Sequence, residues 1–145
     1  VLNPDLVRQL QDQASNVFVH NLVAEYIVRL VMATRTPAEF GMPDLVPVIS
    51  IGCSPRATLG LVAASRALAL IHGREYVLPT DVQAVAKDVM AHRLVLGFDA
   101  VADNVSPVQV VERLVAMVPP PTPVWNTQQR QSAQAAQSHT PSFRN

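Results

Sequence analysis

The sequence predicts an all-α fold: a bundle of about five helices with one minor, short β pairing at most, formed by residues 1–118. Three observations support this prediction. Apolar residues recur at helical spacing in several segments, most of these segments begin with a capping residue before proline or with a capping box, and the strand-like runs are short. A chain of 145 residues, 49% of them hydrophobic, has the size of one domain.

The first two helices are marked by a cap and by apolar faces. Asn3 before Pro4 supplies a capping residue and a first-turn proline, which predicts a helix over residues 4–14. After a short strand-like link at residues 16–19, we expect a second helix over residues 21–34. The two apolar stripes consist of Leu6, Val7, Leu10 and Ala14, and of Val23, Tyr26, Ile27, Leu30 and Val31.

A loop and an apolar third helix follow. Residues 36–51 contain several prolines and end in a β-branched run, which predicts a loop that finishes as an extended segment. Ser54 before Pro55 predicts the start of the third helix, and Gly73 predicts its end after His72. Because this helix is apolar on nearly all sides, we expect it to be the central one.

Two further helices complete the predicted domain. Thr80 and Gln83 form a capping-box pattern, which predicts that the fourth helix begins there. Ser106 before Pro107 predicts the start of the fifth helix, and Gln109 completes a second capping box. The fifth helix is expected to end before the prolines that follow residue 118.

Residues 94–96 are a strand candidate whose partner the sequence leaves open. They pair either with residues 76–78 or with the extended segment that precedes Cys53. Cys53 is the only cysteine, so no internal disulfide can form, and with four scattered histidines it makes no Cys-rich zinc site. The sequence therefore predicts no metal site, and Cys53 is interpreted as a small residue packed in a turn.

The last residues, 119–145, predict a disordered tail rich in proline, glutamine and serine, because they hold few large apolar side chains. Two isolated aromatics in it, Trp125 and Phe143, are candidate anchors for a partner. Without the two arginines of this tail, residues 1–118 carry nine basic and eleven acidic side chains, 9 − 11 = −2. This charge disfavours nucleic acid as a partner.

Several classes of function find no support in the residues. No apolar run reaches the roughly 18 to 20 residues that cross a bilayer, and no signal segment opens the chain, which predicts a cytoplasmic protein without membrane insertion. The glycines are isolated and Lys87 is the only lysine, so a Walker-type phosphate loop is missing. The chain alone is not expected to be an enzyme. Val1 in place of Met suggests a piece cut from a larger protein.

One charge breaks a local rule. Arg56 occupies the second position of the third helix, where the positive end of the helix dipole already favours an anion. An arginine beside the Ser54 cap would add a bidentate fork to an anion site for a visiting phosphate. The alternative is that Arg56 points into water or pairs with Glu39 or Asp44 of the preceding loop.

Seven short motifs carry a family resemblance. They are Tyr26-Ile27-Val28, Ala33-Thr34-Arg35, Gly52-Cys53-Ser54-Pro55-Arg56-Ala57, Leu68-Ala69-Leu70, Gly73-Arg74-Glu75-Tyr76-Val77, Pro79-Thr80-Asp81-Val82 and His92-Arg93-Leu94. Together they resemble the C-terminal helical lid domain of the MoxR family of AAA+ ATPases, over nearly all of residues 1–118. The resemblance implies that the all-α bundle has the AAA+ lid fold.

The resemblance also implies a site and partners. The family's second sensor, whose arginine reaches the γ-phosphate of ATP, falls on Arg56 as catalytic residue, with Ser54, Pro55 and Arg56 binding the nucleotide. ATP with Mg²⁺ is expected in the full-length parent only. The implied partners are the ATPase core of the same or a neighbouring subunit in a homo-oligomeric ring, and a client of chaperone activity. The piece alone is expected to be a monomer. Arg35 and Arg66 are candidates for the interface with the core.

Two other functions stay open. A free-standing helical adaptor would bind a partner helix in an apolar groove. A histone-fold-like DNA-binding module is suggested by a long central helix followed by a strand-like segment and another capped helix. The discriminating feature for DNA binding is charge, and a net −2 with a single lysine offers few phosphate contacts.

Overall fold

The computed structural model describes residues 3–122 and confirms a mainly helical fold. Helices account for most of the described elements, and the strands form a single two-stranded sheet within this part of the chain. The elements are α1 (Pro4–Asn16), α2 (Asn21–Ala33), the 3-10 turns η1 (Pro37–Phe40) and η2 (Pro43–Leu45), β1 (Ile49–Ile51), α3 (Pro55–Ile71), α4 (Pro79–Met90), the 3-10 turn η3 (Ala91–Arg93), β2 (Val95–Leu96), α5 (Phe98–Ala102) and α6 (Pro107–Met117).

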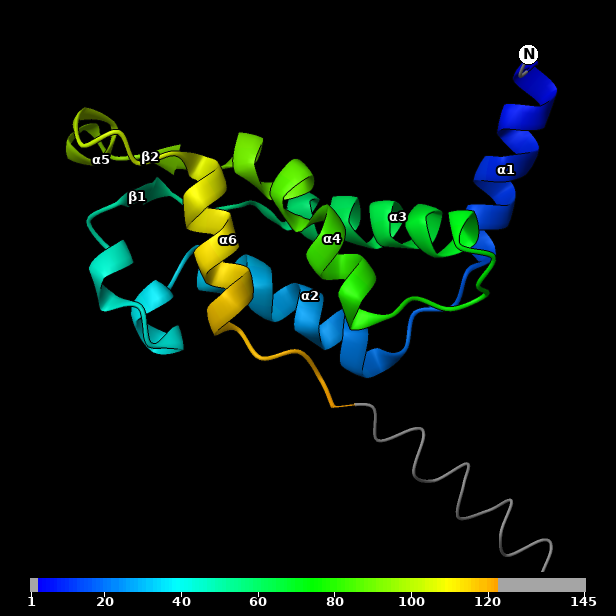
Figure 1. Cartoon of the computed structure of the whole chain (residues 1–145), viewed down its shortest axis with the longest axis horizontal. Coiled ribbons are helices and arrows are strands. Elements are labelled where there is room, and N and C mark those ends of the chain that lie inside the picture. The colour runs from blue at the N-terminus through cyan, green and yellow to red at the C-terminus, as the bar shows by residue number, and fades with distance from the viewer. Residues whose placement is uncertain (1–2, 123–145) are drawn as a thin grey trace, which may run out of the picture.

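Helix α3 is the helix around which the others pack, although it is not buried on all sides. It contacts α4, α1 and α2, and α4 in turn contacts α6. Figure 1 shows α1 projecting from one end of the molecule, with the small sheet and α5 at the other. The prediction that this helix is the central one is confirmed, although Leu59 and Ile71 on α3 remain 71% and 78% exposed. The face that α3 does bury consists of Ala57, Leu61, Ser65 and Ala69.

The structure selects one of the two strand pairings that the sequence allows. Strands β1 and β2 are antiparallel, with Ile49 opposite Leu96 and Ile51 opposite Val95. Tyr76 instead forms an isolated parallel bridge with Phe18. The strand-like link between α1 and α2 therefore pairs with the α3–α4 connection, and β1 brings the start of α3 next to the end of α4.

Two expectations about helix boundaries are corrected. Helix α4 begins at Pro79 with Leu78 as its cap, so Thr80 lies inside the helix and no capping box starts there. The Asp81 carboxylate accepts the backbone N–H of Leu78 at 2.8 Å and takes over the capping role. The sequence also missed α5, which is only five residues long and buries one of them, Ala100. The capping box of Ser106 is confirmed at the start of α6.

The predicted tail lies largely outside the described residues. Residues 119–122 follow α6 without helix or strand, and residues 123–145, with Trp125 and Phe143, are not among those described. The tail thus stays a prediction. None of the helices between residues 3 and 122 has the length and apolarity needed to span a membrane.

Candidate functional site

The start of α3 is held against the end of α2 by a short connection. The backbone N–H of Cys53 donates to the Thr34 hydroxyl at 2.8 Å, and that hydroxyl donates to the Val31 carbonyl at 2.6 Å. Gly52 lies so close that a Cβ there would come within 2.5 Å of the Thr34 carbonyl oxygen. Only glycine fits at this position of the backbone. The close contact fixes the path of the connection, and with it the position of the first turn of α3 on the bundle.

Ser54 caps α3 by position but not by hydrogen bond. Its backbone is extended, with φ −80° and ψ 166°, Pro55 follows at the first helical position, and the Ser54 side chain accepts no cap hydrogen bond. The predicted helix start is confirmed, while the capping contact expected of such a serine is missing. The first turn of α3 contains no acidic side chain. The Ser54 hydroxyl and the backbone N–H of Arg56 therefore remain available to an external anion, whereas the Ala57 N–H donates to the Ser54 carbonyl at 2.8 Å.

Arg56 is exposed and has no ion pair with any carboxylate in residues 3–122. The alternative partner Asp44 is taken by Arg113 of α6, whose Nη2 lies 2.9 Å from an Asp44 oxygen. The hydrogen bond from Arg113 is the main reason that the pKa of Asp44 lies below its ordinary value. Glu39 forms no ion pair with Arg56 either. The Arg56 guanidinium is thus an unpaired cation at the positive end of a helix dipole.

The two other sequence candidates occupy different places. The side chain of Arg35 packs over Gly52, with its Cγ 2.9 Å from the position that a Cβ on Gly52 would take, so Arg35 lies beside the connection to α3. Arg66 lies ten residues beyond Arg56, about 15 Å along the helix axis. Its Nε is buried without a hydrogen-bond partner. The structure therefore brings Arg35 to the start of α3 and leaves Arg66 away from it.

The structure adds Arg93, a residue of the His92-Arg93-Leu94 motif for which the sequence predicted no role. Its Nη1 donates to the Val89 carbonyl near the end of α4, and its Nη2 lies 3.7 Å from the position that a Cβ on Gly60 would take. The signal in the sequence was Gly60 itself, a glycine inside a helix otherwise rich in leucine and alanine.

Cys53 is a buried residue of this connection and not a reactive group. Burial raises the pKa of its thiol, and the smaller effects of the Thr34 hydroxyl and the Arg93 charge do not offset this. The thiol is therefore neutral near pH 7, as a packed structural cysteine should be. Within the described part of the chain, no three His, Cys, Asp or Glu side chains gather as metal ligands would.

Comparison with known proteins gives the chain a family. Residues 46–114 match the family model of the AAA lid domain. The chain is 51% identical over 114 residues to "Chaperone MoxR1" of Mycobacterium tuberculosis, a match that covers 79% of this chain and 30% of that protein. It is 46% identical over 76 residues to "Protein MoxR" of Paracoccus denitrificans, covering 50% of this chain and 22% of that one.

A solved structure agrees with this grouping. The crystal structure of an ATPase candidate from Cytophaga hutchinsonii superposes with a TM-score of 0.79 at 33% identity, covering 81% of this chain and 36% of that chain. The matched residues span only 30% and 32% of the lengths of its relatives in Mycobacterium tuberculosis and Bacillus subtilis, so most of each relative lies outside the match. On these matches and on the helical architecture, the chain belongs to the MoxR family and contains the AAA lid domain of that family.

Proposed function

We propose that Arg56 is the second sensor of a MoxR-type AAA+ ATPase, and that its guanidinium contacts the γ-phosphate of ATP bound to an ATPase core. The observation that carries the proposal is the exposure of an unpaired arginine at the start of α3. An arginine that served only the fold of the lid would be expected to have a partner within it. The hydroxyl of Ser54 and the backbone N–H of Arg56, in a first turn that Pro55 holds in helical geometry, would complete the anion site.

Phosphoryl transfer explains why such a residue would matter. Catalysis of this reaction depends mainly on positioning and on positive charge near the oxygens that gain negative charge. The chain has no Walker-type phosphate loop, so ATP and Mg²⁺ would bind to the core of the full-length protein. An arginine on a separate helical domain would let the lid close when the γ-phosphate is present and relax when it leaves. The lid would thereby couple hydrolysis to movement and to ring assembly.

The proposal includes partners for the surface around Arg56. Arg35, which packs over Gly52 beside the connection to α3, would face the ATPase core of the same or a neighbouring subunit. The coupled movement would act on a client protein, as expected of a chaperone. Isolated, the domain would bind ATP no more tightly than about millimolar, because one arginine and one helix end supply few of the required contacts.

The test is the rate of ATP hydrolysis by the full-length protein that contains this lid. We expect Arg56→Ala to lower kcat about 100-fold, the usual cost of removing one group that stabilises transition-state charge. The matched control is Arg8→Ala, because Arg8 is an exposed arginine on α1 with only a loose ion pair to Asp5 at 3.6 Å. Equal turnover in both variants would contradict the proposal.

A mixing experiment tests whether Arg56 serves its own subunit or a neighbour. Arg56→Ala subunits are combined with subunits whose ATPase core is inactive but whose Arg56 is intact. If Arg56 acts on a neighbouring site, the mixture recovers hydrolysis, because an intact lid then meets an intact core. If it acts within its own subunit, mixing restores nothing. The measurement is turnover as a function of the mixing ratio.

A further inference from the structure

Arginines without carboxylate partners gather at one end of α3. The ion pairs formed within residues 3–122 join Asp5 with Arg8, Asp81 with both His72 and Arg74, and Asp44 with Arg113. None of them involves Arg35, Arg56 or Arg93, and α3 itself contains no acidic residue. This end of the lid is therefore locally cationic, although residues 1–118 carry a net −2. Such a cluster favours an anionic ligand with more than one charge.

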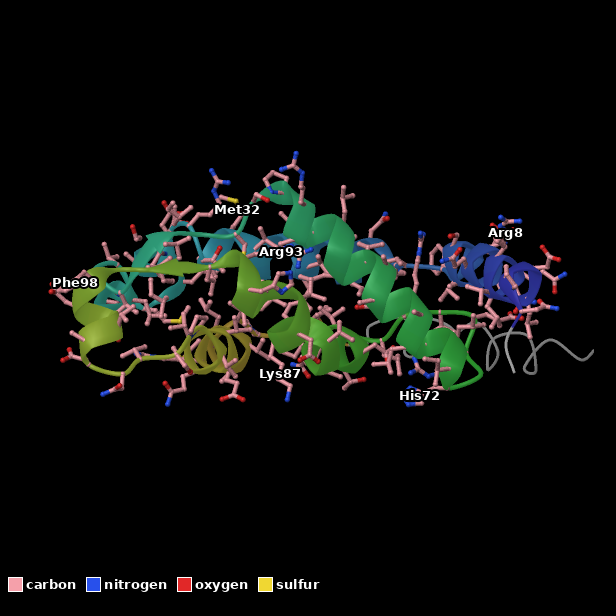
Figure 2. All side chains as sticks on the ribbon, turned by 90° about the horizontal axis from the view of Figure 1, so that it is seen from above. Arg8, Met32, His72, Lys87, Arg93 and Phe98 are labelled. Carbon is pink, nitrogen blue, oxygen red and sulfur yellow. The ribbon has the colours of Figure 1, made fainter. Side chains whose placement is uncertain are left out.

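Arg93 lies beside Gly60, near the same end of α3. A Cβ on Gly60 would lie 3.0 Å from a methyl carbon of Val89 and 3.7 Å from Nη2 of Arg93. At 3.7 Å the guanidinium is in ordinary van der Waals contact with that position, so it lies against α3 at Gly60. Gly60 follows Arg56 by four residues, so the two positions share one face of α3, one turn apart. Figure 2 shows Arg93 beside α3, near the middle of the molecule.

Of the two terminal nitrogens of the Arg93 guanidinium, only Nη1 forms a hydrogen bond within the described residues. Its Nη1 donates to the Val89 carbonyl and also lies against Nε2 of His92. Its Nη2 has no hydrogen-bond acceptor within the described residues, and the residue is only partly buried. Arg93 thus presents a half-anchored guanidinium beside Gly60, which lies one turn from Arg56 on α3.

We infer that Arg93 is a second phosphate-binding arginine of this lid, which holds the phosphate chain of the nucleotide together with Arg56. The inference rests on the function proposed above, because it assigns Arg93 to the same ligand. A triphosphate carries several negative charges, and two guanidinium groups can contact more of its oxygens than one can. Arg56 reaches the ligand from the helix start, and Arg93 reaches it from the α4–η3 side with its position fixed by the Val89 carbonyl.

The experiment compares Arg93→Gln with Arg8→Gln in the full-length protein. Glutamine keeps an N–H donor for the Val89 carbonyl but removes the charge, and Arg8 on α1 lies well away from Arg93 (Figure 2). We expect Arg93→Gln to raise the KM for MgATP about tenfold, in line with the loss of one charge-assisted hydrogen bond. Binding of a non-hydrolysable ATP analogue should weaken by a similar factor, while Tm stays within the range of the control. Arg93→Lys, which keeps the charge, should recover part of the affinity.

The outcomes separate this inference from the proposed function. If Arg56→Ala lowers turnover while Arg93→Gln behaves like the Arg8 control, the inference is wrong and the proposed function stands. If Arg56→Ala has no effect, both are wrong. If Arg93→Gln and Arg93→Lys lower Tm by the same amount, and the affinity for the ATP analogue falls in parallel with Tm, Arg93 only anchors the end of α4. The inference is then again wrong.

Discussion

An arginine lies at each end of α3, and only one of the two is paired with a carboxylate. Just beyond the C-terminal end, Arg74 donates to both carboxylate oxygens of Asp81, at 2.7 and 2.6 Å. Asp81 is 3% exposed and also accepts the Leu78 N–H. At the N-terminal end, Arg56 is exposed and has no carboxylate partner among the described residues. An arginine that serves the fold is satisfied within it, and an unpaired arginine at an unfavourable helix position needs a different explanation.

The C-terminal end of α3 is stabilised by contacts within the lid. Gly73, with φ +68°, ends α3 in a left-handed conformation, and Arg74 then closes the connection to α4 through Asp81. His72 lies near the same pair, with Nδ1 3.1 Å from Nη2 of Arg74. Arg74 and Asp81 satisfy each other within the lid, so this pair contributes to its stability.

The largest effect that follows from this comparison is expected for Asp81→Ala. The change leaves the Arg74 guanidinium without its partner and the Leu78 N–H without its acceptor. We expect the free energy of unfolding to fall by about 3 kcal/mol, as when a buried ion pair loses one member. Urea unfolding of the lid measures it. Asp44→Ala is the control, because it breaks the exposed pair with Arg113 and should have a much smaller effect. Equal losses would mean that burial of Asp81 is energetically unimportant.

A smaller loss of stability is expected for Gly52→Ala at the other end. The new Cβ would lie 2.5 Å from the Thr34 carbonyl oxygen, a backbone atom that can move only if the end of α2 moves. We expect a loss of about 2 kcal/mol from this overpacking. Gly41→Ala is the matched control. Gly41 has φ +77° but nothing within 4 Å of its Cβ position, so that variant carries backbone strain without a clash. A loss no greater than that of Gly41→Ala would show that the connection before α3 can shift.

Local signals in the sequence were sufficient for three of the helix starts. A capping residue followed by proline correctly predicted the starts of α1, α3 and α6, because a cap and the fixed φ of proline act within one turn. The start of α4 was misplaced because the Asp81 carboxylate caps Leu78, a contact that also depends on Arg74. Helix α5 is too short to show a helical period.

The candidate site was only partly predictable for a related reason. The position of Arg56 at a helix start was evident from the sequence, since it depends only on Ser54 and Pro55. The absence of a carboxylate partner for Arg56 was not evident from the sequence. Asp44 was a possible partner, and only the packing of α6 shows that Asp44 pairs with Arg113 instead. Arg93 reaches Gly60 only after α4 packs on α3, so no local pattern could have joined these two residues.

Acid should weaken the C-terminal end of α3, by less than the Asp81→Ala substitution does. Burial raises the pKa of Asp81, but hydrogen bonds from Arg74 and from the Leu78 N–H outweigh it and hold the pKa below the ordinary value. The unfolded chain therefore binds this proton at higher pH than the folded one. The stability from this carboxylate is complete above the ordinary aspartate pKa, about 3.9, and is lost as the pH falls through the folded value. Urea unfolding at several pH values should show the decline, and Asp81→Asn should reduce it. An unchanged pH profile in Asp81→Asn would assign the decline to other carboxylates.

The smallest expected effect on stability is that of Arg56→Gln, and it is the one that distinguishes the two ends most directly. Because a cation at the start of a helix opposes the helix dipole, its removal should leave the lid as stable as before or raise the free energy of unfolding by about 0.3 kcal/mol. Arg56→Glu should raise it further, since it places a favourable charge at the same position. Urea unfolding measures both variants against the unaltered lid. A loss of 1 kcal/mol or more in Arg56→Gln would mean that the guanidinium has a partner within the lid, and Arg56 would then be a structural arginine like Arg74. Stability that is unchanged or higher, together with lost turnover in the full-length protein, would mean that the contact Arg56 makes lies outside this domain.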